Sequence, residues 1–325
     1  MNTRSVVLVT GIAGFCGSHL AELLLERGQA VVGIETEDAP LENLRAVLDR
    51  IELQRVDVRS RDQVRSVVTE VHPCEIYHLA GLTKIPPSGS YQMMHEVNVL
   101  GTINLLEAIC AAGLECSVLI AGSSAEYGLV RPDENPIHES QPFRPITHYA
   151  LSKVAQSLVG YQYWAASGLR IMRSRAFNIV GPRQSPDLVG SAFARQIAEI
   201  EAGRKEPVLQ VGNLEAQRDF VDVRDAVRAY RQIAVQGVPG AVYNVCSGQA
   251  YSIRSLLEAL VGMSSVQEIE IRQEPARLQK ADVKIQIGDY SKLHRHTGWQ
   301  PGISFNQSLR DLLDYWRGRI MEDSA

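Results

Sequence analysis

The chain has 325 residues, of which 45% are hydrophobic, and its 33 Lys and Arg against 37 Asp and Glu leave a net charge of −4. This composition is typical of a large globular protein and disfavours a nucleic acid partner, which calls for a basic excess. The sequence has no apolar run of about 18 residues and no N-terminal signal pattern, so we expect a cytoplasmic protein without a membrane partner. Five scattered cysteines without Cys-x-x-Cys pairs predict reduced thiols and no metal site.

The first predicted unit is a strand, a glycine turn and a helix. Residues 6–9 are apolar, Gly11, Gly14 and Gly17 follow, and residues 19–25 have helical character. A helix N-terminus presents unpaired N–H groups and a partial positive charge, and glycines without Cβ let a pyrophosphate approach the backbone closely. Glycine-rich turns occur in many folds, so the motif gains its weight from its place between strand and helix. We therefore predict a dinucleotide site here.

An acidic residue follows the second predicted strand. Glu35 closes the apolar run 30–34, about twenty residues beyond the glycine turn. A carboxylate at this place accepts hydrogen bonds from the ribose hydroxyls of adenosine and repels a 2′-phosphate. NAD is therefore the favoured cofactor. The alternative interpretation of Glu35 as a polar strand end leaves NADP possible.

Strands and helices alternate through the rest of the first half. The strands are apolar at nearly every position, which is typical of a parallel sheet covered by helices on both faces. We predict an α/β fold with a doubly wound parallel sheet of the Rossmann type. The pattern predicts strands at 51–56, 75–80 and 117–122 and helices at 61–71 and 93–112.

The second half of the chain is less regular. From residue 178 onward proline and glycine interrupt the pattern, which predicts a smaller C-terminal α/β lobe for the substrate. A helix at 222–236 and a strand at 241–245 are expected to return to the main sheet. This division assigns residues 1–177, together with 217–248, to an NAD(P)-binding domain and residues 178–216 and 249–325 to the substrate lobe.

A tyrosine and a lysine four residues apart form the second chemical signal. On a helix Tyr149 and Lys153 share one face, and a nearby cation stabilises a phenolate and lowers the pKa of the tyrosine. Ser123 follows the strand 117–122, at the carboxyl edge where open α/β sheets bind ligands. A hydroxyl there can hydrogen-bond a substrate oxygen beside the phenol. A surface tyrosine and lysine would show the same spacing.

Together these motifs resemble the short-chain dehydrogenase/reductase superfamily, and its extended branch, which acts on sugar nucleotides, fits best. The similarity runs through the chain in order and includes TGIAGFCG (10–17), HLAG (78–81), NVLGT (98–102), YALSK (149–153) and FNIVGPR (177–183). Longer stretches are similar to the reductases of GDP-4-keto-6-deoxy-D-mannose that form GDP-D-rhamnose. These stretches are 194–198, 211–225, 243–248 and 297–301.

The resemblance implies a role for individual residues. Ser123, Tyr149 and Lys153 would be catalytic. Cofactor contacts are implied for Gly11, Ala13, Gly14, Phe15, Cys16, Gly17, Glu35, Asp57, Val58, Leu79, Ala80, Gly81, Tyr149, Lys153 and Phe177. Substrate contacts are implied for Thr83, Ser124, Glu126, Asn178, Arg183, Arg218, Arg277 and Lys280.

The reaction that the resemblance implies is reduction of the C4 ketone of a GDP-4-keto-6-deoxyhexose by NAD(P)H. Tyr149 would donate the proton, Ser123 would hydrogen-bond the same oxygen, and Lys153 would lower the pKa of Tyr149. Arg218 would contact the diphosphate, for which a guanidinium is well suited. The partner is then a GDP-sugar or another nucleotide-diphosphate sugar.

Related activities stay open at this stage. In the 4,6-dehydratases of this branch a threonine and a glutamate act where this chain has Ser123 and Ala125. Glu126 comes one position later, where an extended strand would turn it to the other side. A C4 epimerase with bound NAD would need the same three catalytic residues, and a non-catalytic dinucleotide-sensing protein is the alternative from another class.

The oligomeric state expected from the resemblance is a homodimer. Relatives often dimerise through two helices, which here correspond to the patterns near 93–112 and 150–167. Tyr161, Tyr163 and Trp164 are candidates for that interface.

Overall fold

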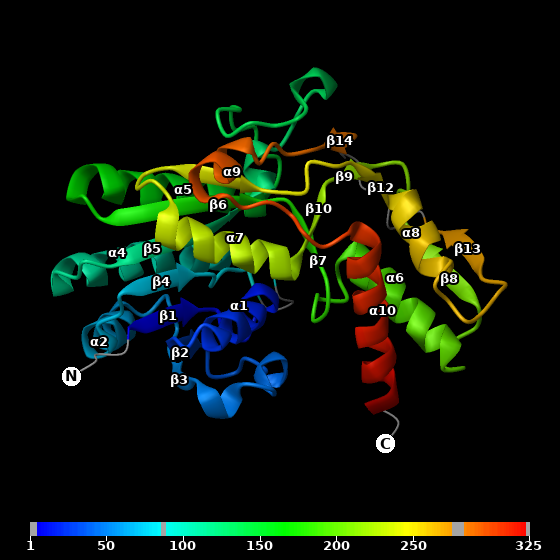
Figure 1. Ribbon diagram of the computed structural model, residues 1–325, viewed down its shortest axis with the longest axis horizontal. Coiled ribbons are helices and arrows are strands. Elements are labelled where there is room, and N and C mark those ends of the chain that lie inside the picture. The colour runs from blue at the N-terminus through cyan, green and yellow to red at the C-terminus, as the bar shows by residue number, and fades with distance from the viewer. Residues whose placement is uncertain (1–4, 86–88, 275–282, 323–325) are drawn as a thin grey trace.

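A parallel sheet of seven strands forms the larger part of the molecule (Figure 1). The computed structural model describes residues 5–85, 89–274 and 283–322. The strand order is β11-β6-β5-β4-β1-β2-β3, so the winding direction reverses between β1 and β4. The strands are β1 (Val6–Thr10), β2 (Ala30–Glu35), β3 (Glu52–Arg55), β4 (Glu75–His78), β5 (Ser117–Ser123), β6 (Arg170–Ala176) and β11 (Val242–Val245).

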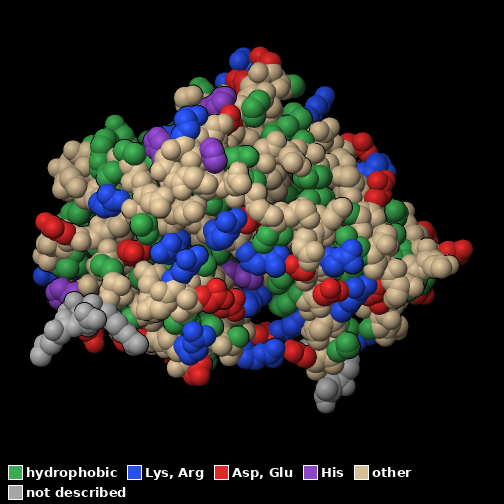
Figure 2. Space-filling view, in the orientation of Figure 1, with side chains coloured by type: hydrophobic (Ala, Val, Ile, Leu, Met, Phe, Trp, Pro, Cys, Tyr) green, Lys and Arg blue, Asp and Glu red, His purple; other side chains and the backbone are tan. Residues whose placement is uncertain are grey.

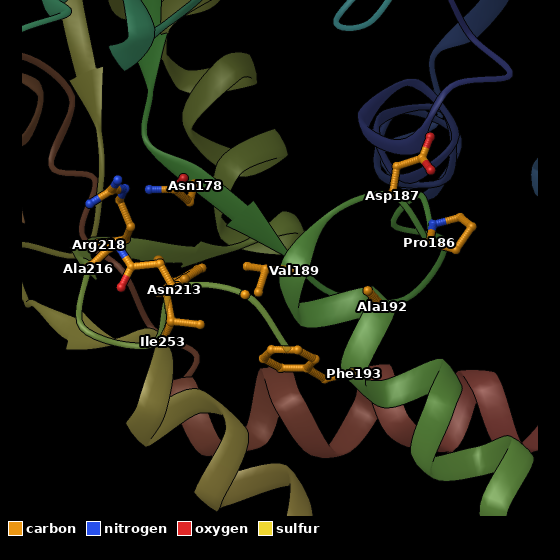
Figure 3. Close-up of a pocket in the computed structure, with 12 residues that line it drawn as sticks. Asn178, Pro186, Asp187, Val189, Ala192, Phe193, Asn213, Ala216, Arg218 and Ile253 are labelled. Atoms are coloured by element: carbon orange, nitrogen blue, oxygen red, sulfur yellow. The ribbon is translucent and has the colours of Figure 1, made fainter. Parts of the chain in front are cut away.

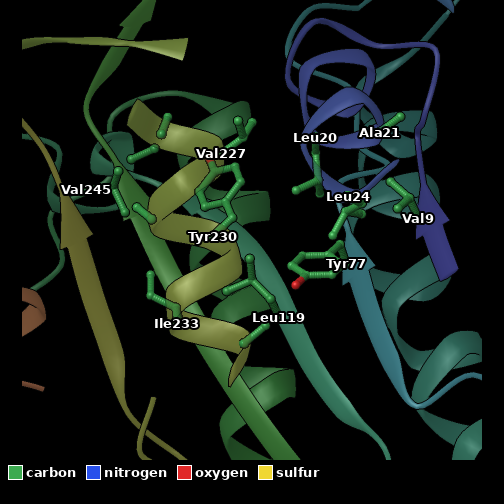
Figure 4. Close-up of a cluster of buried hydrophobic side chains, with 14 of the residues drawn as sticks. Val9, Leu20, Ala21, Leu24, Tyr77, Leu119, Val227, Tyr230, Ile233 and Val245 are labelled. Carbon is green, nitrogen blue, oxygen red and sulfur yellow. The ribbon is translucent and has the colours of Figure 1, made fainter. Parts of the chain in front are cut away.

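Helices cover both faces of this sheet, as predicted for a doubly wound fold. The side chains of β1 alternate, so that Val7 and Val9 pack toward α1 and α7 while Leu8 packs toward α2 and α4. Figure 4 shows the first of these cores, with Tyr77 and Tyr230 between the helices and the strands. The covering helices are α1 (Phe15–Glu26), α2 (Arg61–Val71), α4 (Gly101–Ala112), α5 (His148–Ser167) and α7 (Val223–Gln236).

The helix predicted at 93–112 begins two residues earlier and contains a wider turn. Ser90 caps α3 (Tyr91–His95) by accepting a hydrogen bond from the backbone N–H of Met93 at 3.1 Å. A π-helical segment, η3 (Glu96–Leu100), follows and continues directly into α4. This wider turn carries Asn98, whose side chain is fully buried next to the sheet edge that binds ligands in such folds.

A second hydrophobic core lies beside the sheet and is built by helices α6, α8 and α10 (Figure 1). Short strand pairs and a three-stranded sheet connect these helices. The helices are α6 (Val189–Glu201), α8 (Ile253–Val261) and α10 (Phe305–Glu322). The strands are β7 (Asn178–Val180), β8 (Val208–Val211), β9 (Gln217–Arg218), β10 (Phe220–Asp222), β12 (Tyr251–Ser252), β13 (Glu270–Gln273) and β14 (Ile285–Gln286).

Buried carboxylates join the two cores. Asp222 caps α7 by accepting from the backbone N–H of Arg224 at 2.8 Å, and it also accepts from the hydroxyl of Ser308 on α10 at 2.6 Å.

Part of the segment predicted for the second lobe packs instead on the main sheet. Trp299, which follows α9 (Ser291–Thr297), is 1% exposed and donates its indole N–H to the carbonyl of Asp225 at 3.0 Å.

The surface carries charges of both signs. In Figure 2 basic and acidic side chains are interspersed over the face shown. None of the helices in the described part of the chain is both long and apolar enough to span a bilayer. Within the same residues, no three His, Cys, Asp or Glu side chains gather in a way that could hold a metal ion.

Candidate active site

The glycine turn after β1 is shaped by close backbone packing at two of its three glycines. Gly11 has a φ of +70°, and a Cβ there would lie 2.8 Å from the backbone nitrogen of Ala80. A Cβ on Gly17 would lie 2.8 Å from the Cα of Ile12. Gly14, the N-cap of α1, would meet only the carbonyl oxygen of Gly11, at 3.2 Å. Gly11 and Gly17 are therefore required by the fold, whereas Gly14 leaves the helix N-terminus open to a ligand.

A cavity of about 320 Å³ lies between the turn and the carboxyl ends of β2 and β3. It contains most of the residues for which the sequence predicts contact with the adenosine half of the cofactor. These residues are Gly11, Gly14, Glu35, Asp57, Val58, Leu79, Ala80 and Gly81. Ala13 is connected to the same cavity, because its backbone N–H donates to Glu35 Oε2 at 3.2 Å.

The two carboxylates of this cavity lie in different electrostatic surroundings. Burial raises the pKa of Glu35, although the N–H groups of Ala13 and Thr36 donate to it. Asp57 is held by Arg59, whose Nε donates to Asp57 Oδ2 at 2.8 Å, and this hydrogen bond lowers the pKa of Asp57. The guanidinium of Arg59, which lines this cavity, is thus already paired with a carboxylate of the protein.

A second cavity, of about 410 Å³, lies on the other side of the glycine turn. Gly14, Phe15, Cys16 and Gly17 form one wall, and Thr83 and Phe177 also line it. Ser123, Tyr149 and Lys153 reach it from the end of β5 and from α5. The structure therefore brings all three predicted catalytic residues together beside the predicted cofactor residues.

Within this cavity the phenol of Tyr149 lies close to the side chain of Ser123. Ser123 is itself fixed, because it caps the short helix η4 (Ser124–Tyr127) and accepts from the backbone N–H of Ala125 at 3.2 Å. Lys153 donates to the carbonyl of Ala121 at 2.7 Å, and burial lowers its pKa to about 8. A serine hydroxyl, a phenol and an ammonium thus face one space at the carboxyl edge of the sheet.

The sequence-based expectation about the pKa of Tyr149 was wrong for this structure. Burial raises that pKa, the hydrogen bond with Ser123 opposes the rise only in part, and the charge of Glu126 adds to it. The charge of Lys153, whose ammonium donates to Ala121 and to Gln156, does not offset this rise. Tyr149 is consequently protonated at neutral pH, which is the form that a proton donor needs.

The largest of these cavities, about 580 Å³, opens over the second core (Figure 3). Asn178 and Arg218 lie at one end of it, and the ring of Phe193 lies at the other. The Nη1 atom of Arg218 donates to the carbonyl of Val283 at 2.6 Å. The loop before α6 borders both cavities, because Pro186 lines this one and neighbouring residues line the catalytic one. The two cavities are therefore adjacent along this loop.

Glu126, predicted as a substrate contact, is placed elsewhere. The chain does not continue as a strand after Ser123 but turns into η4, where the carboxylate of Glu126 folds back to accept from the backbone N–H of Ser123 at 3.0 Å. Arg175 of β6 donates to the other carboxylate oxygen at 2.8 Å, and both side chains are almost fully buried. Glu126 therefore supports the serine from within the protein and does not line the cavity.

Two further predicted substrate residues, Arg183 and Ser124, are not among the residues that line the two cavities. Arg183 has a φ of +70° and pairs with Glu22 of α1 at 2.5 Å, a contact that joins the two cores. Ser124 is buried, and its carbonyl accepts from Gln286 at 3.1 Å. Arg277 and Lys280 lie outside the described residues.

Several lining residues were not found from the sequence. In the cavity over the second core these are Phe193, Asn213, Ala216, Phe220 and Ile253, and in the catalytic cavity Tyr230 and Leu188. Only Asn213 carried a local signal, the dipeptide Gly-Asn. The others are apolar or aromatic residues, which a sequence pattern does not distinguish from core or from ordinary loop positions.

Comparison with known proteins places this fold and site in context. Residues 8–312 match the family model described as GDP-mannose 4,6 dehydratase. GDP-6-deoxy-D-mannose reductase of Pseudomonas aeruginosa is 36% identical over 98% of this chain and 99% of its own length. GDP-mannose 4,6 dehydratase of Homo sapiens is 28% identical, covering 95% of this chain and 91% of its own.

Solved structures agree with these relatives. RMD from Pseudomonas aeruginosa, solved in complex with NADPH, has a TM-score of 0.85 at 34% identity and covers 97% of this chain and 99% of its own. UDP-glucose 4-epimerase of Thermus thermophilus, solved with NAD, has a TM-score of 0.84 at 30% identity and covers 96% and 99%.

The doubly wound sheet, the glycine turn and the serine, tyrosine and lysine at its carboxyl edge define the class of extended short-chain dehydrogenases/reductases. Within that class the chain belongs to the GDP-mannose 4,6-dehydratase family.

Proposed function

We propose that this chain reduces the C4 ketone of a GDP-4-keto-6-deoxyhexose, converting GDP-4-keto-6-deoxy-D-mannose to GDP-D-rhamnose with NAD(P)H. The similarity to a GDP-6-deoxy-D-mannose reductase along nearly the whole chain supports this activity. One observation carries it further. Among the described residues that line the catalytic cavity, none is an aspartate or glutamate. A reductase needs only a proton donor there, whereas eliminating water needs an additional acid or base.

The residues around the glycine turn fit a nicotinamide dinucleotide. The close packing at Gly11 and Gly17 holds the turn against α1, and Gly14 leaves the helix N-terminus accessible for a pyrophosphate. Glu35 lines the cavity between the turn and the ends of β2 and β3, where it would accept from ribose hydroxyls, and Lys153 lines the catalytic cavity. When bound in its reduced form, such a cofactor supplies the hydride for the ketone.

The chain's own residues supply the proton and hold the ketone oxygen. Tyr149 donates its phenolic proton to the oxygen that becomes the C4 hydroxyl, while the hydroxyl of Ser123 hydrogen-bonds the same oxygen. The charge on Lys153 favours the tyrosinate that remains after transfer. Arg218 and Asn178, across the larger cavity, hold the diphosphate end of the substrate.

Two substrates separate this reductase from the alternative activities of its family. The purified protein is mixed with freshly prepared GDP-4-keto-6-deoxy-D-mannose, or with GDP-mannose, in the presence of NADH or NADPH. We expect coenzyme oxidation, followed by nicotinamide absorbance, with the ketosugar alone. Conversion of GDP-mannose without net coenzyme use would identify a dehydratase. NAD bound to the protein as purified, with no net oxidation, would indicate an epimerase.

Coenzyme choice follows from the adenosine cavity. We propose a preference for NADH, because Glu35 places a carboxylate beside the ribose and Arg59 is paired with Asp57. RMD from Pseudomonas aeruginosa binds NADPH in its solved structure, so NADPH remains the second coenzyme to test. A lower KM for NADPH than for NADH would overturn this preference.

We also propose a homodimer in the cytoplasm. Helices α4 and α5 pack together, and Leu151, Leu158 and Tyr161 leave about half of their surface exposed on α5. Tyr163 and Trp164 pack against the sheet core but are only partly buried, so they stay candidates for this surface. All five cysteines are free and two are exposed, which suits a reducing compartment. Sedimentation analysis should show a dimer that Leu158→Lys dissociates, and a wild-type monomer would refute the interface.

A further inference from the structure

A buried polar set lies behind Lys153, on the side away from the catalytic cavity. It consists of Thr10 on β1, His78 on β4, Thr102 on α4 and Gln156 on α5. Each of these side chains is at most 1% exposed. None of them lines the cavities described above. Buried polar groups cost free energy unless they are hydrogen-bonded, so their partners indicate what the set does.

The set forms one continuous chain of hydrogen bonds that ends on the catalytic lysine. Thr10 Oγ1 lies 2.8 Å from His78 Nδ1, and His78 Nε2 lies 2.8 Å from Thr102 Oγ1. Gln156 Nε2 lies 2.8 Å from the same Thr102 oxygen. The carbonyl oxygen of Gln156 in turn accepts a short hydrogen bond from Lys153 Nζ.

The direction of every bond in this chain follows from counting protons. Thr102 Oγ1 lies 2.8 Å from the carbonyl oxygen of Asn98, which can only accept, so the single hydroxyl proton is donated there. Thr102 Oγ1 must then accept from both His78 and Gln156. The amide of Gln156 therefore presents its NH₂ to Thr102 and its oxygen to Lys153. His78 carries its proton on Nε2 and accepts from Thr10 on Nδ1.

Charge supports the same assignment. Burial and the neighbouring charge of Lys153 lower the pKa of His78 to about 3, so the imidazole is neutral. The ammonium of Lys153 has three protons, of which Ala121 O and Gln156 Oε1 accept two. One N–H of this lysine is left for the cavity that it lines. An amide fixed in this orientation gives the cation an acceptor that cannot rotate away.

We propose that Gln156 is a positioning residue for Lys153, held in its accepting orientation by Thr102 and His78. By accepting a hydrogen bond from the ammonium group, Gln156 keeps Lys153 Nζ at the wall of the catalytic cavity and stabilises the charged form of the lysine. This assignment rests on the proposed function only in giving Lys153 a catalytic role. The placement of the lysine itself can be tested without turnover.

Other titratable groups near Lys153 also affect its pKa, so a test of Gln156 must leave them unchanged. Glu126, beyond the end of β5, is the charge that raises the pKa of the lysine, and Tyr149 shares its helix. Neutral His78 faces it from β4, and the thiol of Cys16 lines the same cavity from the glycine turn. None of these residues is altered in the variants below, so a changed titration reports on Gln156 and its orientation.

The first test is the pH dependence of Lys153 acetylation by acetic anhydride, followed by peptide mass spectrometry on the full-length protein. In Gln156→Leu we expect the midpoint to fall by about one pH unit, which corresponds to loss of one charge-assisted hydrogen bond. Thr102→Val should shift it in the same direction by a smaller amount, because the amide is then free to turn. Thr102→Ser, which keeps the hydroxyl, should titrate like wild type.

Controls separate positioning from loss of stability. Gln196→Leu removes another buried glutamine, which accepts from the backbone N–H of Gln210 at 3.0 Å in the second core. It should lower the melting temperature without moving the Lys153 midpoint. If Gln156→Leu does not fold, the difference between the Lys153 midpoints of Thr102→Val and Thr102→Ser still tests the proposal. Midpoints equal to wild type in Gln156→Leu and Thr102→Val would overturn the proposal.

The second readout is the Kd of NADH, measured by nicotinamide fluorescence across the same pH range. We expect Gln156→Leu and Thr102→Val to weaken binding several-fold above pH 7 and much less below it. A wild-type protein that binds NADH but leaves the ketosugar unchanged would refute the proposed reaction and not the role of Gln156. Equal weakening at every pH would contradict the role of Gln156 and leave the reaction intact.

Discussion

The cofactor end of the site, at the glycine turn, and its substrate end, over the second core, are constructed differently. The cofactor end is a backbone surface, because its wall is a glycine turn whose dimensions depend on the absence of Cβ atoms at Gly11 and Gly17. The substrate end is a side-chain surface, assembled from β7, α6, the 212–220 segment and α8. A backbone surface is rigid and recognises a common chemical group, a pyrophosphate. A side-chain surface can change residue by residue, so we expect specificity for one sugar nucleotide to lie there.

Tyr149→Phe should have the largest effect on turnover. The cofactor end is formed mainly by backbone, but the proton transfer there depends on this one side chain. Removing one hydroxyl eliminates the proton donor, so turnover should fall by about 10²–10⁴-fold. The Kd of NADH should change little, since the ring remains. Steady-state kinetics and fluorescence titration measure the two quantities. Wild-type turnover in this variant would contradict the assignment.

The glycines sharpen the comparison directly. Gly17→Ala should destabilise the protein by about 1–3 kcal/mol and abolish cofactor binding, because the new methyl group meets Ile12 and Gly11. Gly14→Ala should fold normally and lose cofactor affinity alone, since only the Gly11 carbonyl lies nearby. Thermal unfolding with and without NADH separates the two outcomes. Equal melting temperatures for both variants would argue against a fold requirement at Gly17.

Arg218→Ala tests the side-chain end. Loss of a charge-assisted contact to the diphosphate should raise the KM of the GDP-sugar by about 10- to 100-fold. The kcat and the Kd of NADH should stay near wild type. Arg272→Ala serves as the matched control, because this arginine is exposed on β13 and pairs with Glu270. An unchanged KM in Arg218→Ala would remove Arg218 from the substrate site.

The change of activity with pH should be the smallest of these effects. Lys153 must be charged, and burial lowers its pKa to about 8, so activity should decline as pH rises through about 8. Tyr149 must be protonated, and its raised pKa keeps it so below its ordinary value of about 10. A profile of kcat/KM should therefore show one alkaline limb, set by the lysine. A limb at acidic pH from a group in this cavity would contradict this account.

The difference between the two ends also determines what could be predicted from the sequence. Local patterns were sufficient for the alternating strands and helices and for the glycine turn, because each depends on short-range geometry. The meeting of Ser123 with Tyr149 and Lys153 was predicted from the carboxyl-edge rule for open α/β sheets and from the family resemblance. The buried contacts of Glu126, predicted as a substrate residue, were missed, since they depend on a turn after Ser123 and on Arg175, 49 residues away. The raised pKa of Tyr149 was also missed, because it depends on burial. The apolar lining around Phe193 was missed because it depends on tertiary packing.

The central claim is hydride delivery to C4 without chemistry at C5. The most direct measurement is a single turnover of GDP-4-keto-6-deoxy-D-mannose with NADH deuterated at the transferred position, followed by NMR of the isolated product. The account predicts one deuterium at C4, none at C5, and oxidation of one coenzyme per product. Deuterium at C5, or product formed without net coenzyme oxidation, would contradict it.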